Sequence, residues 1–297
     1  MTETPLLHDS LRQRLAMLAL NPRKTRASSM KGERRSTRRG TSVEFADYRN
    51  YAAGDDLRKL DWNVYARLDR PIVKLYEDEE DLIVHVLLDN SASMGTTGAE
   101  VESEKLSYAR QLAAGAGYVA LGGNDRLTVT TLGNTTEPVF SGRGRSGIVG
   151  MLRGLQSVAA TGRIDLNAAL KQFTLREKRG GMVFLITDLF APEGYLEGLK
   201  ALLAKGHEVV LLHTLSREEL DPSLVGDLRL IDVETGQAQE VTIDVALRNQ
   251  YMTSLQRWLD GVRTECTRRG VLYALAATDQ PLEALFLRDL RRLGVVR

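Results

Sequence analysis

The sequence predicts an α/β protein with a doubly wound, mostly parallel sheet and an N-terminal extension of strands and loops. Three apolar runs rich in Val, Ile and Leu, at residues 82–88, 182–187 and 207–215, have the composition of strands buried on both faces. Segments with apolar residues at helical spacing separate them, such as residues 102–121 and 195–205. Buried strands that alternate with helices form a parallel sheet with helices on both faces.

The other predicted elements continue this alternation along the chain. A strand at residues 126–132 is followed by helices at 148–157 and 166–176. A hairpin with strands at 228–233 and 240–244 precedes a helix at 247–263. A strand at 271–277 and a helix at 281–293 complete the chain.

Composition divides the chain into four parts. Residues 80–297 carry the α/β pattern, and residues 1–20 contain a short helix with Leu11, Leu15 and Leu18 on one face. Between them, residues 21–40 hold eight Lys or Arg and one acid, and we expect a flexible linker there. Residues 41–79 form an extension that we expect to pack on the main domain, with a half-buried strand around residues 74–76.

Composition also excludes several classes of protein. The formal net charge is +1, and the basic segment at 21–40 has no interleaved aromatic residues, so we do not expect nucleic-acid binding to be the function. A single cysteine, Cys266, excludes an intramolecular disulfide or a cysteine zinc cage. We find neither an apolar stretch approaching the ~20 residues that span a bilayer nor a signal-peptide pattern, so we expect a soluble, cytoplasmic protein.

Acidic and hydroxyl side chains follow two of the buried strands. Asp89, Ser91 and Ser93 come after the first, and Asp188 comes directly after residues 182–187. The carboxyl ends of parallel strands share one edge of a sheet, where open α/β sheets place their ligand sites. A turn in which Asp and Ser bond backbone amides would explain the first group alone, but not its convergence with Asp188. Hard oxygen ligands of this kind suit Mg²⁺ or Mn²⁺.

An enzyme is the alternative interpretation of these residues. A metal-dependent phosphohydrolase would use Asp89 as nucleophile and Asp188 as a ligand. Such chemistry needs an acid/base group two residues after the nucleophile, and that position is Ser91. The glycine-rich segment 142–147 lacks the Gly-Lys-Ser/Thr of a phosphate-binding loop, and no Gly-x-Ser-x-Gly elbow occurs. We therefore expect a protein that is not an enzyme.

The chain resembles a von Willebrand factor type A domain. The resemblance rests on Asp-x-Ser-x-Ser-Met at residues 89–94, the segments 123–127 and 166–170, and Ile-Thr-Asp at 186–188. It implies a metal-ion-dependent adhesion site, in which the metal accepts an acidic side chain from a partner.

The N-terminal half resembles a bacterial family catalogued as a domain of unknown function. The residues that carry this likeness are 39–51, 54–62 and 65–67. Members are often encoded beside MoxR-type AAA+ ATPases. The resemblance therefore implies a metal-assisted adaptor that works with such an ATPase and its client.

Two departures from the family pattern matter. The second metal loop of the family reads Gly-Gly-Thr-Asp-Leu, with the threonine as a direct ligand, whereas Ile164 stands at that position here. Thr161 or Asp165 are the available substitutes, and we expect weak metal binding. Many members also carry two transmembrane helices before the signature, whereas this chain has the short helix at 9–20, as expected of a soluble member.

Charged and aromatic residues of the extension are the other candidates. Its acids, with the two arginines nearby, predict an ion-pair network rather than a second acidic site. Trp62 and Tyr65 favour packing onto the sheet domain over stacking on a ligand. Alternatively, the segment forms a partner surface, and both interpretations stay open. The candidate residues are Asp55, Asp56, Arg58, Asp61, Trp62 and Arg67.

Overall fold

A computed structural model gives the fold, and it separates the chain into two units. The described residues are 5–23, 43–52, 55, 57, 60–78, 82–95, 103–133, 136–223, 226–231 and 238–297. One unit comprises residues 1–27 and 82–297, and the other comprises residues 28–81.

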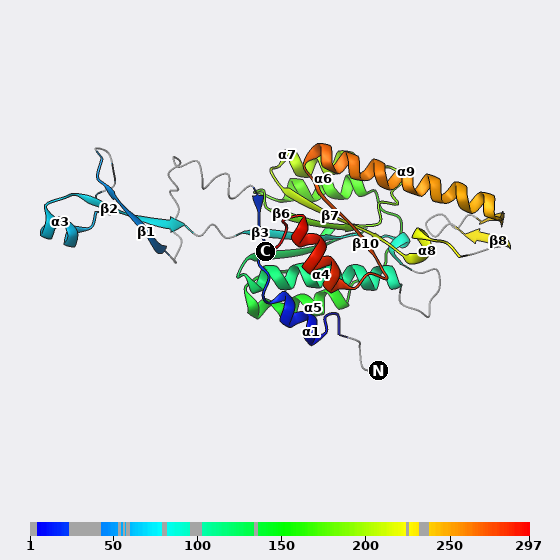
Figure 1. Ribbon diagram of the computed structural model, residues 1–297, viewed down its shortest axis with the longest axis horizontal. Coiled ribbons are helices and arrows are strands. Elements are labelled where there is room, and N and C mark those ends of the chain that lie inside the picture. Colours follow the sequence, from blue (N-terminus) through cyan, green and yellow to red (C-terminus); the bar gives the residue numbers. More distant parts are fainter. Residues whose placement is uncertain are drawn as a thin grey trace. The chain divides into compact units, whose positions relative to one another are not determined.

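The larger unit is built on a six-stranded sheet with the order β10-β7-β6-β3-β4-β5 (Figure 1). All neighbouring pairs are parallel except β4 and β5, which are antiparallel. This confirms the predicted doubly wound, mostly parallel sheet. The strands are β3 (Ile83–Leu88), β4 (Arg126–Leu132), β5 (Thr136–Arg143), β6 (Met182–Thr187), β7 (Glu208–Leu215) and β10 (Leu272–Ala277).

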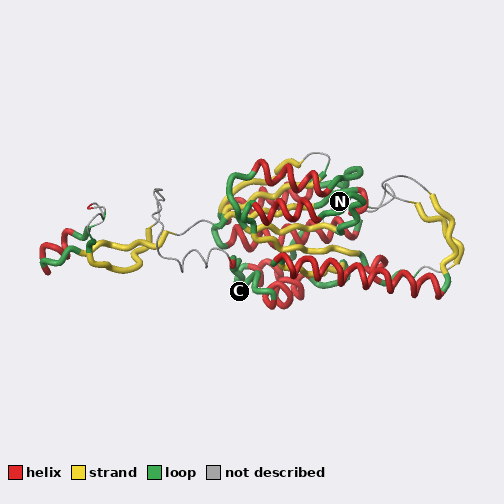
Figure 2. Tube along the Cα trace, turned by 90° about the horizontal axis from the view of Figure 1, so that it is seen from above, coloured by secondary structure: helices red, strands yellow, loops and turns green. Residues whose placement is uncertain are grey.

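Helices cover both faces of this sheet (Figures 1 and 2). One face carries α1 (Asp9–Leu15), α4 (Glu104–Gly122) and α5 (Ile148–Gln156). The other carries α6 (Leu166–Arg176), α7 (Leu196–Ala204) and α9 (Val245–Arg269).

The apolar core is divided between the two faces by the strands themselves. Along β3, Val84, Val86 and Leu88 pack on the α4 side, and Leu87 packs on the α6 side. Successive side chains of a strand point to opposite faces, so a continuous apolar run is needed where both faces are covered. The same requirement explains why the apolar runs identified β3, β6 and β7 from sequence.

Short elements complete the larger unit. A helical turn α8 (Arg217–Leu220) follows β7, and the hairpin β8 (Gly226–Ile231) and β9 (Ala238–Ile243) precedes α9. After β10, α10 (Leu282–Ala284) leads into a π-helical segment, Leu285–Leu290, whose Phe286 is buried on the α4 side. None of the helices in the described part of the chain is both long and apolar enough to cross a bilayer.

Several elements of the larger unit differ from the sequence predictions. Strand β5 was not predicted; its Pro138 lies on an edge strand, where a missing N–H is tolerated. The first helix ends at Leu15 rather than at residue 20, because Leu20 pairs with Val296 as an isolated β-bridge. Helix α9 is longer than predicted at both ends, and the predicted last helix is a short α-helical turn followed by the π-helix.

The smaller unit is an antiparallel pair of strands with a helix between them. β1 (Val43–Asn50) pairs with β2 (Ile72–Asp78), which contains the predicted strand at residues 74–76. The connecting helix α3 (Trp62–Leu68) was not predicted. Residues 24–40 of the proposed linker lie outside the described residues, so their mobility stays a prediction, as does the packing of the extension on the main domain.

Close packing of α5 on the edge strand gives a prediction with an internal control. A Cβ added at Gly154 would lie 2.7 Å from the Val139 carbonyl oxygen, whereas one added at Gly261 of α9 meets nothing within 4 Å. Gly261→Ala is expected to stabilise the protein by about 0.5–1 kcal/mol through helix propensity. Gly154→Ala is expected to destabilise it by about 1–2 kcal/mol, because the backbone of α5 or β5 must shift to make room for the added methyl group. Urea unfolding measures both, and an equal gain in both variants would contradict the close approach.

Candidate functional site

The first part of the site is the loop that follows β3. Asp89 is held in line with the sheet because its N–H donates to the Ile186 carbonyl at 2.9 Å. Its Oδ1 accepts from the Ser91 N–H at 2.9 Å, and the Ser91 and Ser93 hydroxyls share a hydrogen bond of 3.0 Å. Asp89 and Ser91 are buried, and Ser93 is half-buried in the short 3₁₀ turn Ala92–Met94.

The second part is the end of β6, the strand beside β3. The Thr187 hydroxyl donates to Asp89 Oδ2 at 2.6 Å, and the next residue is Asp188, which is 1% exposed. Burial, together with the negative charge of Asp188, raises the pKa of Asp89 to about 6, although hydrogen bonds from Thr187 and Ser91 oppose this. The structure therefore brings Asp89, Ser91, Ser93 and Asp188 to one edge of the sheet, and we call these four residues the acid site.

The loop at residues 161–165, which corresponds to the second metal loop of the family, offers fewer metal ligands than the family pattern implies. The Thr161 hydroxyl donates to the Asn90 carbonyl at 3.1 Å, which ties this loop to the one after β3. Ile164 is buried in the apolar cluster beneath α6. Asp165 is exposed and caps α6, its Oδ1 accepting from the Ala168 N–H at 2.9 Å. A buried isoleucine side chain thus stands at position 164, where the family has the metal-binding threonine hydroxyl. The Asp165 carboxylate caps α6.

A lysine that sequence reasoning missed lies against the acid site. Lys105, in the first turn of α4, places Nζ 2.9 Å from Asp188 Oδ2 and 2.5 Å from Glu219 Oε1 of α8. Burial acts against its charge, but the carboxylates of Asp188 and Glu219 outweigh this and hold the pKa of Lys105 above its ordinary value. A signal for it existed in the sequence, since Lys105 shares a helix face with the buried Ala109 and Leu112.

One aromatic side chain, Phe190, lies against this ion pair. The Phe190 ring lies 5.1 Å from Lys105 Nζ and stacks on Trp258, with 5.4 Å between centroids. The Phe190 N–H donates to Asp188 Oδ1 at 3.0 Å, so both oxygens of this carboxylate are engaged. Leu189 between them adopts a left-handed backbone conformation with φ of 58°, a strained geometry for a branched residue.

The acid site has the donor types that a hard divalent ion prefers. Carboxylate and hydroxyl oxygens come together at the ends of β3 and β6. The described residues contain no group of three or more His, Cys, Asp or Glu side chains arranged around one point, so an ion here would depend on hydroxyls. The residues therefore fit Mg²⁺ or Mn²⁺ in kind, with Ile164 and Lys105 working against tight binding.

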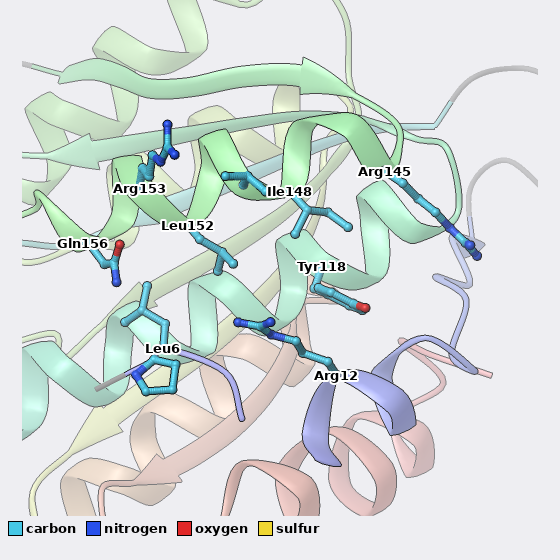
Figure 3. A pocket seen from close by; sticks show the side chains of 10 residues that line it. Leu6, Arg12, Tyr118, Arg145, Ile148, Leu152, Arg153 and Gln156 are labelled. Atoms are coloured by element: carbon cyan, nitrogen blue, oxygen red, sulfur yellow. The ribbon is translucent and has the colours of Figure 1, made fainter. Parts of the chain in front are cut away.

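A separate hollow lies on the α4 face of the sheet (Figure 3). It has a volume of about 550 Å³, and apolar side chains of α4, α5 and the segment before α1 line it together with three arginines. Figure 3 shows Arg12, Arg145 and Arg153 around Leu152 and Tyr118. No residue of the acid site lines it.

The candidates in the extension have structural partners. Asp55 accepts from Arg49 Nη2 at 2.8 Å and from the Ala52 N–H at 2.8 Å. Asp61 is buried and caps α3, its Oδ1 accepting from the Asn63 N–H at 3.0 Å.

The remaining candidates differ in exposure. Trp62 is 58% exposed and meets Tyr65 edge to face, and Arg67 is exposed in the last turn of α3. Asp56 and Arg58 lie outside the described residues. Packing of Trp62 and Tyr65 on the sheet domain stays a prediction, as does the alternative of a partner surface.

Fold and site together define a class. A doubly wound sheet with an Asp-x-Ser-x-Ser loop after one central strand and an acid after its neighbour has a von Willebrand factor type A-like fold. The chain belongs to the family described as "Protein of unknown function DUF58", which matches residues 47–258.

The chain is similar to two mycobacterial proteins and to two solved structures. The uncharacterized proteins Mb1516 of Mycobacterium bovis and Rv1480 of Mycobacterium tuberculosis are each 32% identical over 216 residues, which cover 71% of this chain and 67% of theirs. The crystal structure of BatB from Bacteroides thetaiotaomicron is similar over 72% of this chain and 98% of its own, with 15% identity and a TM-score of 0.42. A von Willebrand factor type A structure from Catenulispora acidiphila has 12% identity and a TM-score of 0.36, over 48% of this chain and 35% of its own.

Proposed function

We propose that the chain is a non-catalytic protein–protein interaction module whose acid site receives an acidic side chain of a partner. The observation that carries this proposal is the convergence of Asp89, Ser91, Ser93 and Asp188 at the carboxyl edge of the sheet. Lys105 pairs with Asp188, whereas Asp89 accepts from the neutral Ser91 N–H and Thr187 hydroxyl, so the buried Asp89 charge can still be matched by a cation. A cation between the acid site and a partner carboxylate would give a directional, charge-assisted contact.

Mg²⁺ or Mn²⁺ is the ion we propose for this contact. Asp89, Ser91, Ser93 and Asp188 would hold it, directly or through water, and its positive charge would attract the partner carboxylate. Weak binding follows from two features of the site: Ile164 supplies no oxygen, and Asp188 Oδ2 already accepts from Lys105.

A MoxR-type AAA+ ATPase and its client are the partners we propose, in the cytoplasm. The resemblance of residues 39–51, 54–62 and 65–67 to the family signature supports the choice, because it implies a family whose members are often encoded beside such ATPases. The ATPase would supply the energy for the joint activity. The sequence of this chain shows no phosphate-binding loop of its own.

An enzymatic role for Asp89 has less support. Both of its carboxylate oxygens accept hydrogen bonds, from the Ser91 N–H and the Thr187 hydroxyl. The residue two positions later is Ser91, which is not an acid/base group at neutral pH. Hydrolysis of a generic phosphate ester by the purified chain, lost in Asp89→Asn, would instead support the phosphohydrolase.

A binding experiment with a purified partner tests the proposal. The full chain is immobilised, and a MoxR-type ATPase from the same organism is passed over it with Mg²⁺ or with chelator. Asp89→Asn is expected to weaken binding at least about tenfold, as loss of a charge-assisted contact does. Asp260→Asn on the exposed face of α9 is the control and should bind as the unaltered chain does. Equal binding by all three proteins, with and without chelator, would defeat the proposal.

A further inference from the structure

The acid site already contains a cation of its own. Lys105 is 5% exposed, and its Nζ lies within 3 Å of carboxylate oxygens of both Asp188 and Glu219. These oxygens belong to the end of β6 and to α8, so one ammonium joins two segments that are far apart in sequence. A lysine buried to this extent is found where its charge is paired.

Charge is distributed unevenly over the site. Asp188 and Glu219 have the ammonium as a neighbour, whereas Asp89 accepts from two neutral donors, the Ser91 N–H and the Thr187 hydroxyl. Asp188 Oδ2 is the oxygen that Lys105 holds, and Oδ1 accepts from the Phe190 N–H. A divalent ion that used Asp188 would therefore meet the ammonium at the same carboxylate.

We propose that the Lys105 ammonium is the resident cation of the acid site, and that a divalent ion reaches Asp188 only by displacing it. This inference rests on the proposed function, because it specifies how ion uptake at that site is controlled. Two positive charges at one carboxylate repel each other, so the ammonium lowers the affinity for the ion. Glu219 remains as its partner after displacement, since Lys105 Nζ is 2.5 Å from Oε1.

Displacement of the Lys105 ammonium would affect elements outside the acid site. Glu219 Oε2 accepts from the Ser216 N–H at 2.7 Å and closes the capping box of α8. The Glu219 carbonyl accepts from the Tyr251 hydroxyl of α9 at 2.6 Å. The ammonium is thus linked through Glu219 to both α8 and α9. Displacement of the ammonium would therefore change the interactions of both helices.

Direct measurement of Mn²⁺ binding tests the displacement. Free Mn²⁺ is followed by electron paramagnetic resonance with the full chain, Lys105→Met and Lys200→Met. Lys200 is the matched control, because it pairs with the Glu197 carboxylate at 2.6 Å on the exposed face of α7. Lys105→Met is expected to bind Mn²⁺ at least about tenfold more tightly than the unaltered chain, and Lys200→Met equally. Asp89→Asn should abolish Mn²⁺ binding, both in the otherwise unaltered chain and in combination with Lys105→Met.

A second measurement uses the unaltered chain and so does not depend on the folding of a variant. The ¹⁵N resonance of Lys105 Nζ is followed as Mg²⁺ is added, and it should move while that of Lys200 stays. If Lys105→Met does not fold, the response of the Lys105 resonance to Mg²⁺ tests the proposal by itself. Mn²⁺ affinity unchanged in a folded Lys105→Met, or a Lys105 resonance that Mg²⁺ leaves unmoved, would overturn the proposal.

The two proposals fail separately. Neither ion measurement contains a partner, so chelator-sensitive capture of the ATPase together with a Lys105 resonance that Mg²⁺ leaves unmoved would contradict the role of Lys105 alone. An ion response without capture would contradict the interaction function alone.

Discussion

Lys105→Met is expected to lower the free energy of unfolding by about 3–5 kcal/mol, the cost of breaking a buried ion pair by removing one partner. Asp188 is 1% exposed and would be left without its cation, and Glu219 would lose the same neighbour. Methionine preserves much of the length and the apolar stem of the lysine, so the loss reports on charge. Urea unfolding followed by far-ultraviolet circular dichroism measures it.

The double variant Lys105→Met/Asp188→Asn isolates the pair. The amide oxygen that this second substitution introduces would still be able to accept from the Phe190 N–H, which now donates to Asp188 Oδ1 at 3.0 Å. We expect the double variant to be more stable than the sum of the single losses predicts, by about 1–3 kcal/mol, because contacting residues couple to this extent. Lys200→Met removes an exposed pair and is expected to leave stability unchanged. Additive losses would show that Lys105 and Asp188 do not stabilise each other.

Much of the sheet could be predicted because burial on both faces leaves a strong trace. Strands β3, β6 and β7 are apolar runs with helices between them, and the strand order then places Asp89 and Asp188 at adjacent strand ends. The antiparallel edge strand β5 leaves a weaker trace. Its residues are mostly half-buried or exposed, and it includes Pro138, which reads as a strand breaker.

The electrostatics of the site could not be predicted with the same success. Lys105 and Glu219 are 114 residues apart, and only the folded sheet brings α4 and α8 together. Residue type alone assigns both to the surface. Asp165 illustrates a related point: it is the residue directly before α6, and a carboxylate at that position caps a helix whether or not a metal is near. Local spacing thus identified the donors, and long-range packing decided which of them are available.

Thr187 is the second residue whose replacement should have a large effect. Its hydroxyl donates to Asp89 Oδ2 at 2.6 Å and accepts from the Leu189 N–H at 3.0 Å, and it is fully buried. Thr187→Val keeps the shape but leaves a buried carboxylate oxygen and a backbone N–H without partners. The free energy of unfolding is expected to fall by about 2–4 kcal/mol, since each unsatisfied buried group costs about 1–3 kcal/mol.

Thr214→Val provides the matched control for this prediction. Thr214 is equally buried on the neighbouring strand β7, but its hydroxyl donates to the Leu212 carbonyl at 3.3 Å rather than to a carboxylate. Its replacement should cost at most about 1 kcal/mol, the net value of an ordinary hydrogen bond. Thr187→Ser should retain most of the stability lost in Thr187→Val, because it keeps the hydroxyl. Equal losses in the two valine variants would mean that the Thr187 hydroxyl is not what makes a charged Asp89 tolerable inside the sheet edge.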